Sequence, residues 1–225
     1  MKILALDTAT EACSVSLCIG DRVLDRYVEL ERGHAEQLLP MVDSVLAEGG
    51  IALSALDAIA FGRGPGGFTG VRLAASVAQG LAFGAQVGVV PISDLAAVAQ
   101  RVVQLNPAVR RVLVANDARM REVYWASFDV DGVLTSGPER VSAAADVEVP
   151  VGNVAAWAAA GRGLIAWPDL AERCRAAGAE LHADLLPRAS EVLALARAAV
   201  AARQILDPAD ALPVYVRDRV TQSAL

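Results

Sequence analysis

The sequence predicts an α/β protein, and three observations lead to that prediction. Short extended segments open the chain, an amphipathic helical pattern follows them, and a glycine-rich turn joins an apolar strand to a second helix. The chain has 225 residues, of which 55% are hydrophobic, so it can bury a large core in one domain or two small ones. The apolar residues occur in short runs, which indicates a globular protein without a transmembrane segment.

The first predicted elements form an antiparallel meander. Residues 2–6, 13–19 and 22–30 have the apolar content of strands, and the segment DTATEA and the turn Gly20-Asp21 separate them. The opening apolar run is too short for the apolar region of a signal peptide, because Asp7 interrupts it. We therefore expect a strand at the start of the chain and a cytoplasmic protein.

A helix is predicted from His34 to Glu48, and Gly49-Gly50 provides its end. Pro40 would kink this helix or mark its real start, because proline has no backbone N–H. Apolar residues recur at the spacing of one helix face: Leu38, Met41, Val42, Val45 and Leu46.

A strand at 57–61, the glycine-rich turn and a helix at about 70–83 follow in that order. Small residues line one face of this helix, so another helix could approach it closely: Ala74, Ala75, Ala78 and Ala82. A further strand is predicted at 87–90. Ser93 is expected to cap a helix that continues through Leu105.

The second half of the chain begins as the first does. Residues 112–128 repeat the plan of strand, aspartate, short turn and strand, which places Asp117 opposite Asp7. Such a match also arises by chance, and both explanations stay open at this point. Later elements are a hairpin turn at Asp131-Gly132, a loop at 161–163, a helix at 191–205 capped by Ser190, and an extended segment at 213–217.

The glycine-rich turn GRGPGGFTG allows three interpretations. It fails as a P-loop because Phe68 occupies the position of the phosphate-binding lysine. It satisfies the dinucleotide pattern GxGxxG, with Asp94 as a distant ribose-binding acid, but Pro65 removes one donor and the opening meander does not suit that fold. The third interpretation, which we favour, is a structural turn that lets the strand reverse tightly and its helix pack closely: Gly62, Gly64, Gly66, Gly67, Thr69 and Gly70.

Other candidate sites are sparse. Asp7 and Thr8 end the first strand and could position a metal-bound phosphate, although such a pair often only caps a turn. A metal site at His34 would need a second ligand one turn later, where Leu38 stands, so we expect no metal centre. The three cysteines are Cys13, Cys18 and Cys174; they form no CxxC pair and indicate a reducing compartment. The net charge of −6 disfavours direct binding of nucleic acid.

Several segments together resemble the TsaB (YeaZ) family. The resemblance rests on ILALDTATEACSVSL at the start, HAEQLLPMVDSVL at 34–46, FGRGPGGFTGVRLAASVAQGLAFG at 61–84 and DARMREVYWA at 117–126. The loop AGRGLIAWPDL and the tail PVYVR agree as well, so that most of the chain is covered.

The resemblance implies an actin- and hexokinase-like (ASKHA, ribonuclease H-like) fold, duplicated in two domains with mixed sheets flanked by helices. We expect these domains at residues 1–106 and 107–225. The resemblance also implies a role in N6-threonylcarbamoyladenosine (t6A) modification of tRNA. TsaB proteins are partners of TsaD, the transferase, and an ATPase, TsaE, completes the assembly.

TsaD proteins carry an HxxxH metal pair where this chain has His34 and Leu38, so the resemblance implies a non-catalytic scaffold. ATP and metal are expected on the partner subunits, tRNA is expected only through the complex, and a homodimer is expected in isolation. Asp7 and Thr8 would be a vestigial nucleotide site. The candidate residues for contact with TsaD are Leu38, Val42, Val45, Ala74, Ala78 and Leu81, unless they fill the core of this chain. The alternative is an ATP-dependent enzyme or a peptidase-like hydrolase with the same fold.

Overall fold

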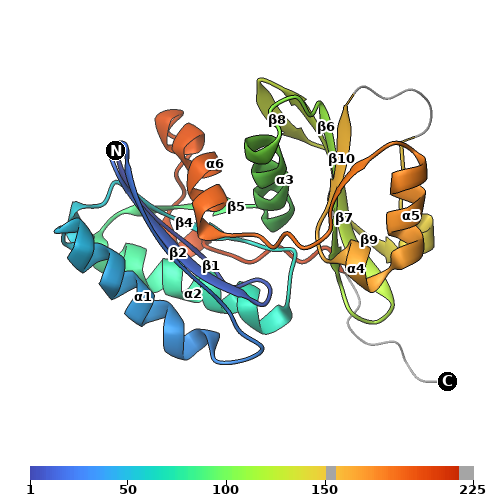
Figure 1. Ribbon diagram of the computed structural model, residues 1–225. Helices are drawn as coiled ribbons and strands as arrows, with labels where there is room; N and C mark the ends of the chain where they lie inside the picture. The colour runs from blue at the N-terminus through green and yellow to red at the C-terminus, as the bar shows by residue number, and fades with distance from the viewer. Residues whose placement is uncertain (151–155, 218–225) are drawn as a thin grey trace.

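The protein contains two mixed β-sheets, each flanked by helices (Figure 1). The structure is a computed structural model, and it describes residues 1–150 and 156–217. The first sheet has the strand order β3 (Arg22–Glu29), β2 (Ala12–Ile19), β1 (Lys2–Asp7), β4 (Ala58–Gly62) and β5 (Gly88–Ile92). β1 pairs antiparallel with β2 and parallel with β4, so the opening meander and the later parallel strands share one sheet.

The second sheet repeats this plan. Its strands are, in order, β8 (Val133–Ser136), β7 (Glu122–Asp131), β6 (Arg111–Asp117), β10 (Trp157–Ala160) and β11 (Glu180–His182), and β9 (Arg140–Ala143) also pairs with β7. Like β1, β6 pairs antiparallel with the next strand and parallel with a later one. The expected duplicated, ribonuclease H-like arrangement is therefore confirmed.

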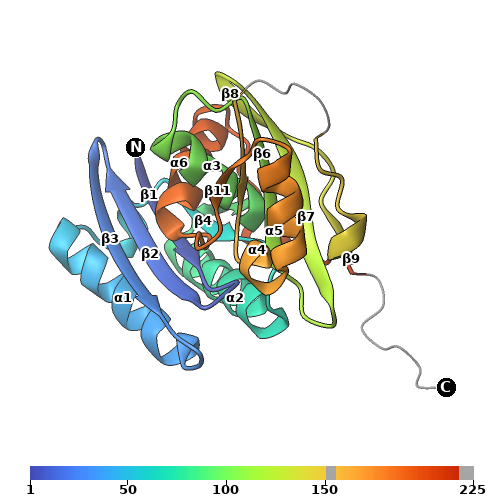
Figure 2. The same ribbon diagram turned by 45° about the vertical axis from the view of Figure 1, so that its right-hand side comes forward.

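The helices lie in three layers around the sheets (Figures 1 and 2). α1 (His34–Gly49) and α2 (Phe68–Ala85) cover the outer face of the first sheet. α4 (Gly163–Ala166) and α5 (Pro168–Ala176) cover the outer face of the second sheet. α3 (Asp94–Leu105) and α6 (Ala189–Ala201) lie between the sheets.

The two helices of the middle layer are exchanged between the halves. α3 follows the first sheet in sequence, yet Leu95, Val98 and Val102 pack on residues of the second sheet. α6 follows the second sheet, yet Val192 and Ala196 pack on the first. A division of the chain at 106/107 therefore separates the two sheets but does not separate their packing. Residues 151–155 and 218–225 of the second predicted domain lie outside the described residues.

Most predicted elements agree with the structure, including the Ser93 cap, whose side chain accepts a hydrogen bond from Ala96 N. Pro40 lies inside α1, which starts at His34. The helix predicted for 191–205 is displaced, since α6 spans Ala189–Ala201. It ends early because Arg203 adopts a positive φ of 58°, after which Leu206 pairs with Val89 at the edge of the first sheet.

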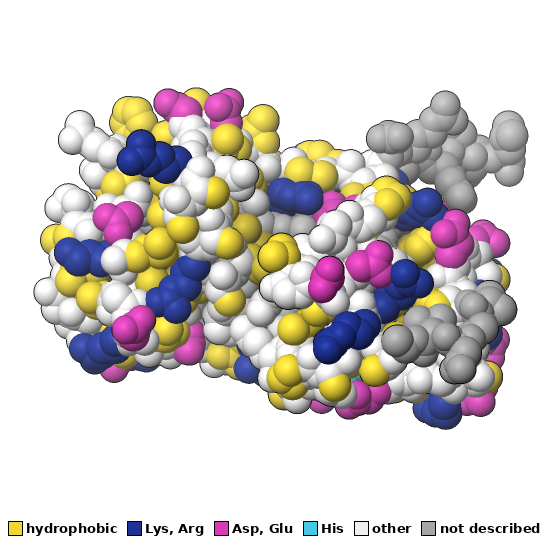
Figure 3. Space-filling view, turned by 90° about the horizontal axis from the view of Figure 1, so that it is seen from above, with side chains coloured by type: hydrophobic (Ala, Val, Ile, Leu, Met, Phe, Trp, Pro, Cys, Tyr) yellow, Lys and Arg dark blue, Asp and Glu magenta, His cyan; other side chains and the backbone are white. Residues whose placement is uncertain are grey.

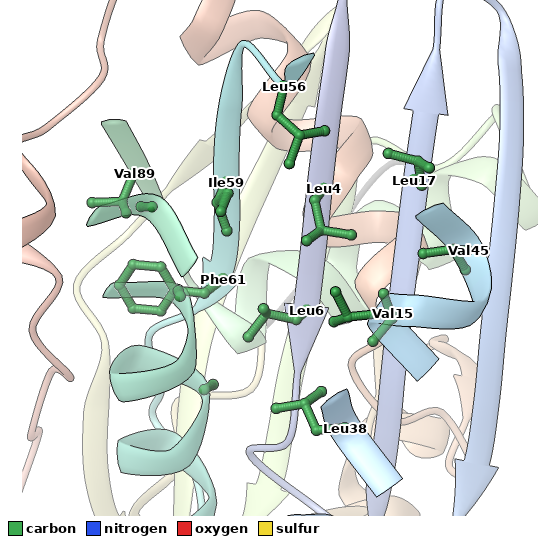
Figure 4. Packing of buried hydrophobic residues seen from close by; sticks show 14 of the residues in the cluster. Leu4, Leu6, Val15, Leu17, Leu38, Val45, Leu56, Ile59, Phe61 and Val89 are labelled. Carbon is green, nitrogen blue, oxygen red and sulfur yellow. The ribbon is translucent and has the colours of Figure 1, made fainter. Parts of the chain in front are cut away.

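The core between α1, α2 and the first sheet explains this layer of the fold. Leu38 and Val45 of α1 point at Leu6, Val15 and Leu17 of the sheet (Figure 4). On α2 the inward residues are alanines, which let the helix backbone lie close to the strands. The small face predicted for this helix therefore faces its own sheet.

Candidate functional site

A large cleft lies where strands of both sheets end. Its volume is about 890 Å³, which is in the range of small-molecule sites. Four segments line most of it: the turn after β1 (8–11), the glycine-rich turn (65–70), the turn after β6 (116–120) and the C-terminal segment (214–217). The cleft thus gathers the segments that the sequence patterns single out.

Thr8 lines the first-half side of this cleft, Asp7 directly precedes it, and both side chains are buried. Asp7 Oδ1 accepts a hydrogen bond of 2.8 Å from Ala9 N, and Thr8 Oγ1 donates one of 2.7 Å to the carbonyl of Gly70. The other carboxyl oxygen, Asp7 Oδ2, is buried and has no hydrogen-bond partner among the described residues. Because both side chains are buried, they do not fit a metal-bound phosphate, which needs oxygen atoms that are accessible to its metal.

The glycine-rich turn packs on the same segment. Gly67 N donates to the carbonyl of Ala9 at 2.7 Å, so this amide is not available to an anion. A Cβ on Gly66 or Gly70 would collide with the backbone of Ala9 or Thr8. The glycines are needed for this close approach of two backbones, as the structural interpretation predicts.

Asp94 has a role different from that of a ribose-binding acid. It is the first residue of α3 and is fully buried, and its Oδ2 accepts a short hydrogen bond from Gly64 N. Burial and the neighbouring Asp7 raise the pKa of Asp94 well above its usual range. The dinucleotide interpretation is wrong here, because this carboxyl group fastens the glycine-rich turn.

The second-half side of the cleft differs in exposure. Asp117 is partly exposed; its Oδ1 accepts from Arg119 N at 3.0 Å and its Oδ2 lies 3.2 Å from the Arg119 guanidinium. Asn116 is 5% exposed, and neither atom of its amide has a hydrogen-bond partner among the described residues. Gly161 lies against Asn116 Oδ1, with a φ of 100° that favours glycine.

Ion pairs join the two halves across the cleft. Arg162 contacts Glu29 at 2.5 Å and Glu11 at 3.9 Å, and Arg119 contacts Glu11 at 3.4 Å. The C-terminal segment adds another link, since Arg217 bonds Glu122 while Val214 N donates to the carbonyl of Arg63. The two halves are therefore joined by polar contacts as well as by the exchanged helices α3 and α6.

His34 lies at the edge of the cleft as the first residue of α1. Its Nε2 lies 2.9 Å from the carbonyl oxygen of Thr10, so it serves as the helix-start residue that we expect. In residues 1–150 and 156–217 no group of three or more His, Cys, Asp or Glu side chains is arranged to hold a metal.

The residues predicted for partner contact require a correction. Leu38, Val42, Val45, Ala74 and Ala78 are at most 2% exposed, and Leu81 packs against the same cluster. They fill the core of this chain, because the apolar stripe of each helix faces its own sheet. Helical periodicity identifies a buried stripe but not the surface against which it is buried.

The outward faces of α1 and α2 carry a different set of residues. Phe83 is 79% exposed and Leu39 is 47% exposed. On α2, small exposed residues also recur one turn apart: Ser76, Gly80 and Gly84. A Cβ on either glycine would meet nothing within 4 Å. We call these five residues the outer helix face.

Sequence patterns missed the outer helix face, Asp94 and Asn116. The signal for the outer helix face is a pair of glycines inside a helix. No neighbouring part of the described chain requires these two positions to lack a side chain. The signal for Asp94 is an acidic residue at the start of a helix that directly follows a buried strand. No sequence signal marks Asn116, because its lack of partners depends on the loop that covers it.

No helix in the described part of the chain is long and apolar enough to cross a membrane.

Comparison with known proteins agrees with the duplicated fold. The family model described as "TsaD: tRNA N6-adenosine threonylcarbamoyltransferase" matches residues 28–209. Over its full length the chain is 40% identical to the tRNA threonylcarbamoyladenosine biosynthesis protein TsaB of Escherichia coli, covering 98% of it. It is 37% identical to the protein of the same name from Haemophilus influenzae, covering 97% of it.

A solved structure supports the same assignment. The structure of YeaZ from Pseudomonas aeruginosa superposes with a TM-score of 0.87 and 47% sequence identity, over 95% of this chain and 99% of that one. The chain therefore belongs to the TsaD family and, within it, to the TsaB (YeaZ) proteins.

Proposed function

We propose that this chain is a non-catalytic, activating subunit in the formation of N6-threonylcarbamoyladenosine beside the anticodon of ANN-decoding tRNAs, and that it acts by binding TsaD. The names of the bacterial relatives support the pathway. The observation that carries the binding role is the outer helix face, which is exposed, partly apolar and without a structural purpose within the described chain.

The energetics of the outer helix face favour a helical partner. A glycine in the interior of a helix destabilises it by about 1 kcal/mol relative to alanine. Gly80 and Gly84 have no close neighbour that would exclude a side chain, so the fold itself gains nothing from them. Small residues at this spacing let a second helix approach closely, and Phe83 and Leu39 provide apolar area at the edges.

The cleft supports the non-catalytic part of the proposal. The Thr8 hydroxyl and Gly67 N, which would bind a phosphate in an ATP-dependent enzyme, are bonded to neighbouring backbone, and the Asp7 carboxyl group is buried. The chain alone is therefore proposed to bind no cofactor, with ATP and metal on the partner subunits, including TsaE. The same outer helix face would allow a homodimer when TsaD is absent.

Direct contact with tRNA is not part of the proposal. The chain has a net charge of −6, and Figure 3 shows acidic and arginine side chains interspersed on one face of the molecule. The release of counterions, which favours binding of nucleic acid to basic surfaces, is therefore expected to contribute little on this face. We propose that tRNA binds through the complex.

Binding to TsaD tests the role of the outer helix face. Phe83→Ala should weaken binding of purified TsaD by about tenfold or more, because truncation of an exposed aromatic anchor removes about 1–2 kcal/mol or more. Gly80→Leu should abolish binding by steric exclusion while leaving the chain at least as stable. Ala176→Leu, on exposed α5, is the matched control and should bind normally. Unchanged binding by both variants would show that another surface is used.

Reconstitution tests the function itself. Formation of t6A on tRNA by TsaD, TsaE and the remaining components of the pathway should require this chain, and omission of the chain should abolish the product. ATP turnover by the chain without any partner tests the enzymatic alternative. Robust turnover that Asp7→Ala abolishes would overturn the non-catalytic assignment.

A further inference from the structure

Two buried carboxyl groups meet beneath the glycine-rich turn. Asp7 ends β1 and Asp94 begins α3, and both are 0% exposed. One oxygen of each has a partner in the backbone: Asp7 Oδ1 accepts from Ala9 N, and Asp94 Oδ2 accepts from Gly64 N. Both remaining oxygens crowd the position that a Cβ on Gly62 would occupy, so they face each other across this glycine.

These two facing oxygens have no other partner within the described residues. Two ionised carboxylates in that position would repel each other in a site of low dielectric constant, and neither could donate a hydrogen bond. A proton on one of them removes the repulsion and provides the missing donor, because a protonated carboxyl group has one O–H.

We propose that Asp7 and Asp94 share a single proton and that the resulting O–H···O bond is a latch that holds the end of β1, the glycine-rich turn and the start of α3 together. The latch has three attachments. Asp7 is fixed to the turn after β1, Asp94 is fixed to Gly64, and the shared proton joins the two aspartates. Gly62 is required at the centre because a side chain there would push the two carboxyl groups apart.

The charged and titratable groups around the pair come from three elements. Arg63 acts on Asp94 from the turn but is itself paired with Glu139 at 3.0 Å. Cys13 lies on β2, next to the residue paired with Asp7, and burial together with the charge of Asp7 raises its pKa to about 11, so it stays a neutral thiol near pH 7. Burial is also the main cause of the raised pKa of Asp94, which agrees with a proton held at this site.

The latch predicts a specific dependence on pH. The folded-state pKa of Asp94 lies above its unfolded value, so the stabilisation is complete below the unfolded pKa. It is lost as the pH rises through the folded pKa, when the proton leaves the pair. The segment most affected is the glycine-rich turn, and with it the start of α2.

Amide substitutions distinguish a shared proton from ordinary packing. Asp94→Asn keeps the acceptor for Gly64 N and donates from Nδ2 to Asp7, so it should shift the thermal midpoint at pH 7 by less than about 4 °C. Asp7→Asn should behave alike. The double variant places two N–H donors against each other, and its midpoint should fall by at least about 6 °C more than the sum of the single changes. An additive double variant, or two severely destabilised single variants, would overturn the proposal.

Two further measurements test the proton directly. Infrared difference spectra should contain a carboxylic-acid C=O band at neutral pH that Asp94→Asn removes and Asp129→Asn, an exposed control, retains. The thermal midpoint of the unmodified chain should fall as the pH rises from the unfolded pKa of aspartate through the raised folded pKa of Asp94, and Asp94→Asn should flatten this decline. Burial also raises the pKa of Glu191. Because Glu191 is present in the unmodified chain and in the Asp94→Asn variant, its contribution to the pH dependence of stability cancels in the comparison. Absence of the band, or parallel pH profiles, would contradict the shared proton.

Discussion

The two halves of the protein share a topology but differ at the end of their first strands. Asp7 and Asp117 occupy corresponding positions, and each accepts a hydrogen bond from the amide two residues later. The second oxygen of Asp7 is buried against Asp94, whereas that of Asp117 pairs with Arg119 at the surface. The same local turn therefore lies in a closed environment in one half and an open one in the other.

This difference separates the features that the two halves share from those in which they differ. The strand order and the hydrogen-bonded aspartate turn recur in both halves because the backbone geometry requires them. The polar groups beyond the turn depend on which loop covers them. In the first half the covering loop is the glycine-rich turn. It buries polar groups that could otherwise bind a ligand, so these groups stabilise the fold instead.

The largest expected effect comes from a change at the tightest backbone contact of the first half. Gly70→Ala places a Cβ against the carbonyl oxygen of Thr8 and should reduce the free energy of unfolding by about 3 kcal/mol. In the second half, Gly163→Ala meets the Ala115 carbonyl oxygen at 2.6 Å and should cost less, since that contact is longer. Denaturant unfolding measures both changes. Gly80→Ala is the control and should stabilise α2 by about 1 kcal/mol. If all three substitutions changed the free energy of unfolding equally, the close backbone contacts at Gly70 and Gly163 would be contradicted.

An intermediate effect is expected at the paired aspartates. Asp7→Ala leaves Ala9 N and the facing oxygen of Asp94, Oδ1, without partners in a buried site and should cost about 2–3 kcal/mol. Asp117→Ala removes a similar turn hydrogen bond at a partly exposed position and should cost about 1 kcal/mol. Chemical denaturation at pH 7 compares the two variants. If Asp117→Ala proves the more damaging, the distinction between a closed and an open half is wrong.

The smallest effect is expected at the ion pairs that join the halves. Arg162→Gln removes the contacts with Glu29 and Glu11, and because all three side chains are partly exposed the loss should stay below about 1 kcal/mol. The loss should shrink further in about 1 M salt, where such charges are screened. Thermal unfolding at low and high salt gives this comparison, with Arg175→Gln, in the exposed pair with Glu172 on α5, as the control. A large, salt-independent loss would assign Arg162 a packing role.

Local signals predicted most of the fold. Helix spacing located α1 and α2, Ser93 located the start of α3, and the repeated strand–aspartate–strand pattern located β6 and β7. The short strands β9, β10 and β11 were not predicted from the residues, because four-residue and three-residue strands carry too little periodicity. The exchange of α3 and α6 between the sheets was also beyond prediction, since an apolar helix face does not identify its partner.

The candidate site was predicted only in part. The glycine-rich turn was interpreted as structural because its sequence lacks a lysine and contains a proline, and the close backbone contacts at Gly66 and Gly70 agree with that interpretation. The partner contact was placed on the wrong faces of α1 and α2, since apolar residues at helical spacing mark the core in most soluble helices. The exposed alternative, with Gly80 and Phe83, becomes visible only once burial is known.

By itself, the sequence determined the class of the fold and the need for glycine between β4 and α2, while the duplicated pattern was implied by the resemblance to the TsaB family. These properties depend on backbone sterics and on the spacing of apolar residues, which are local. Only the tertiary structure decided that Asp7 meets Asp94, 87 residues away in the chain, and that α2 turns its alanines inward and Gly80 and Gly84 outward. Such pairings depend on how the strands are ordered in the sheet and on which surfaces remain after the core is packed, and neither is encoded in a single segment.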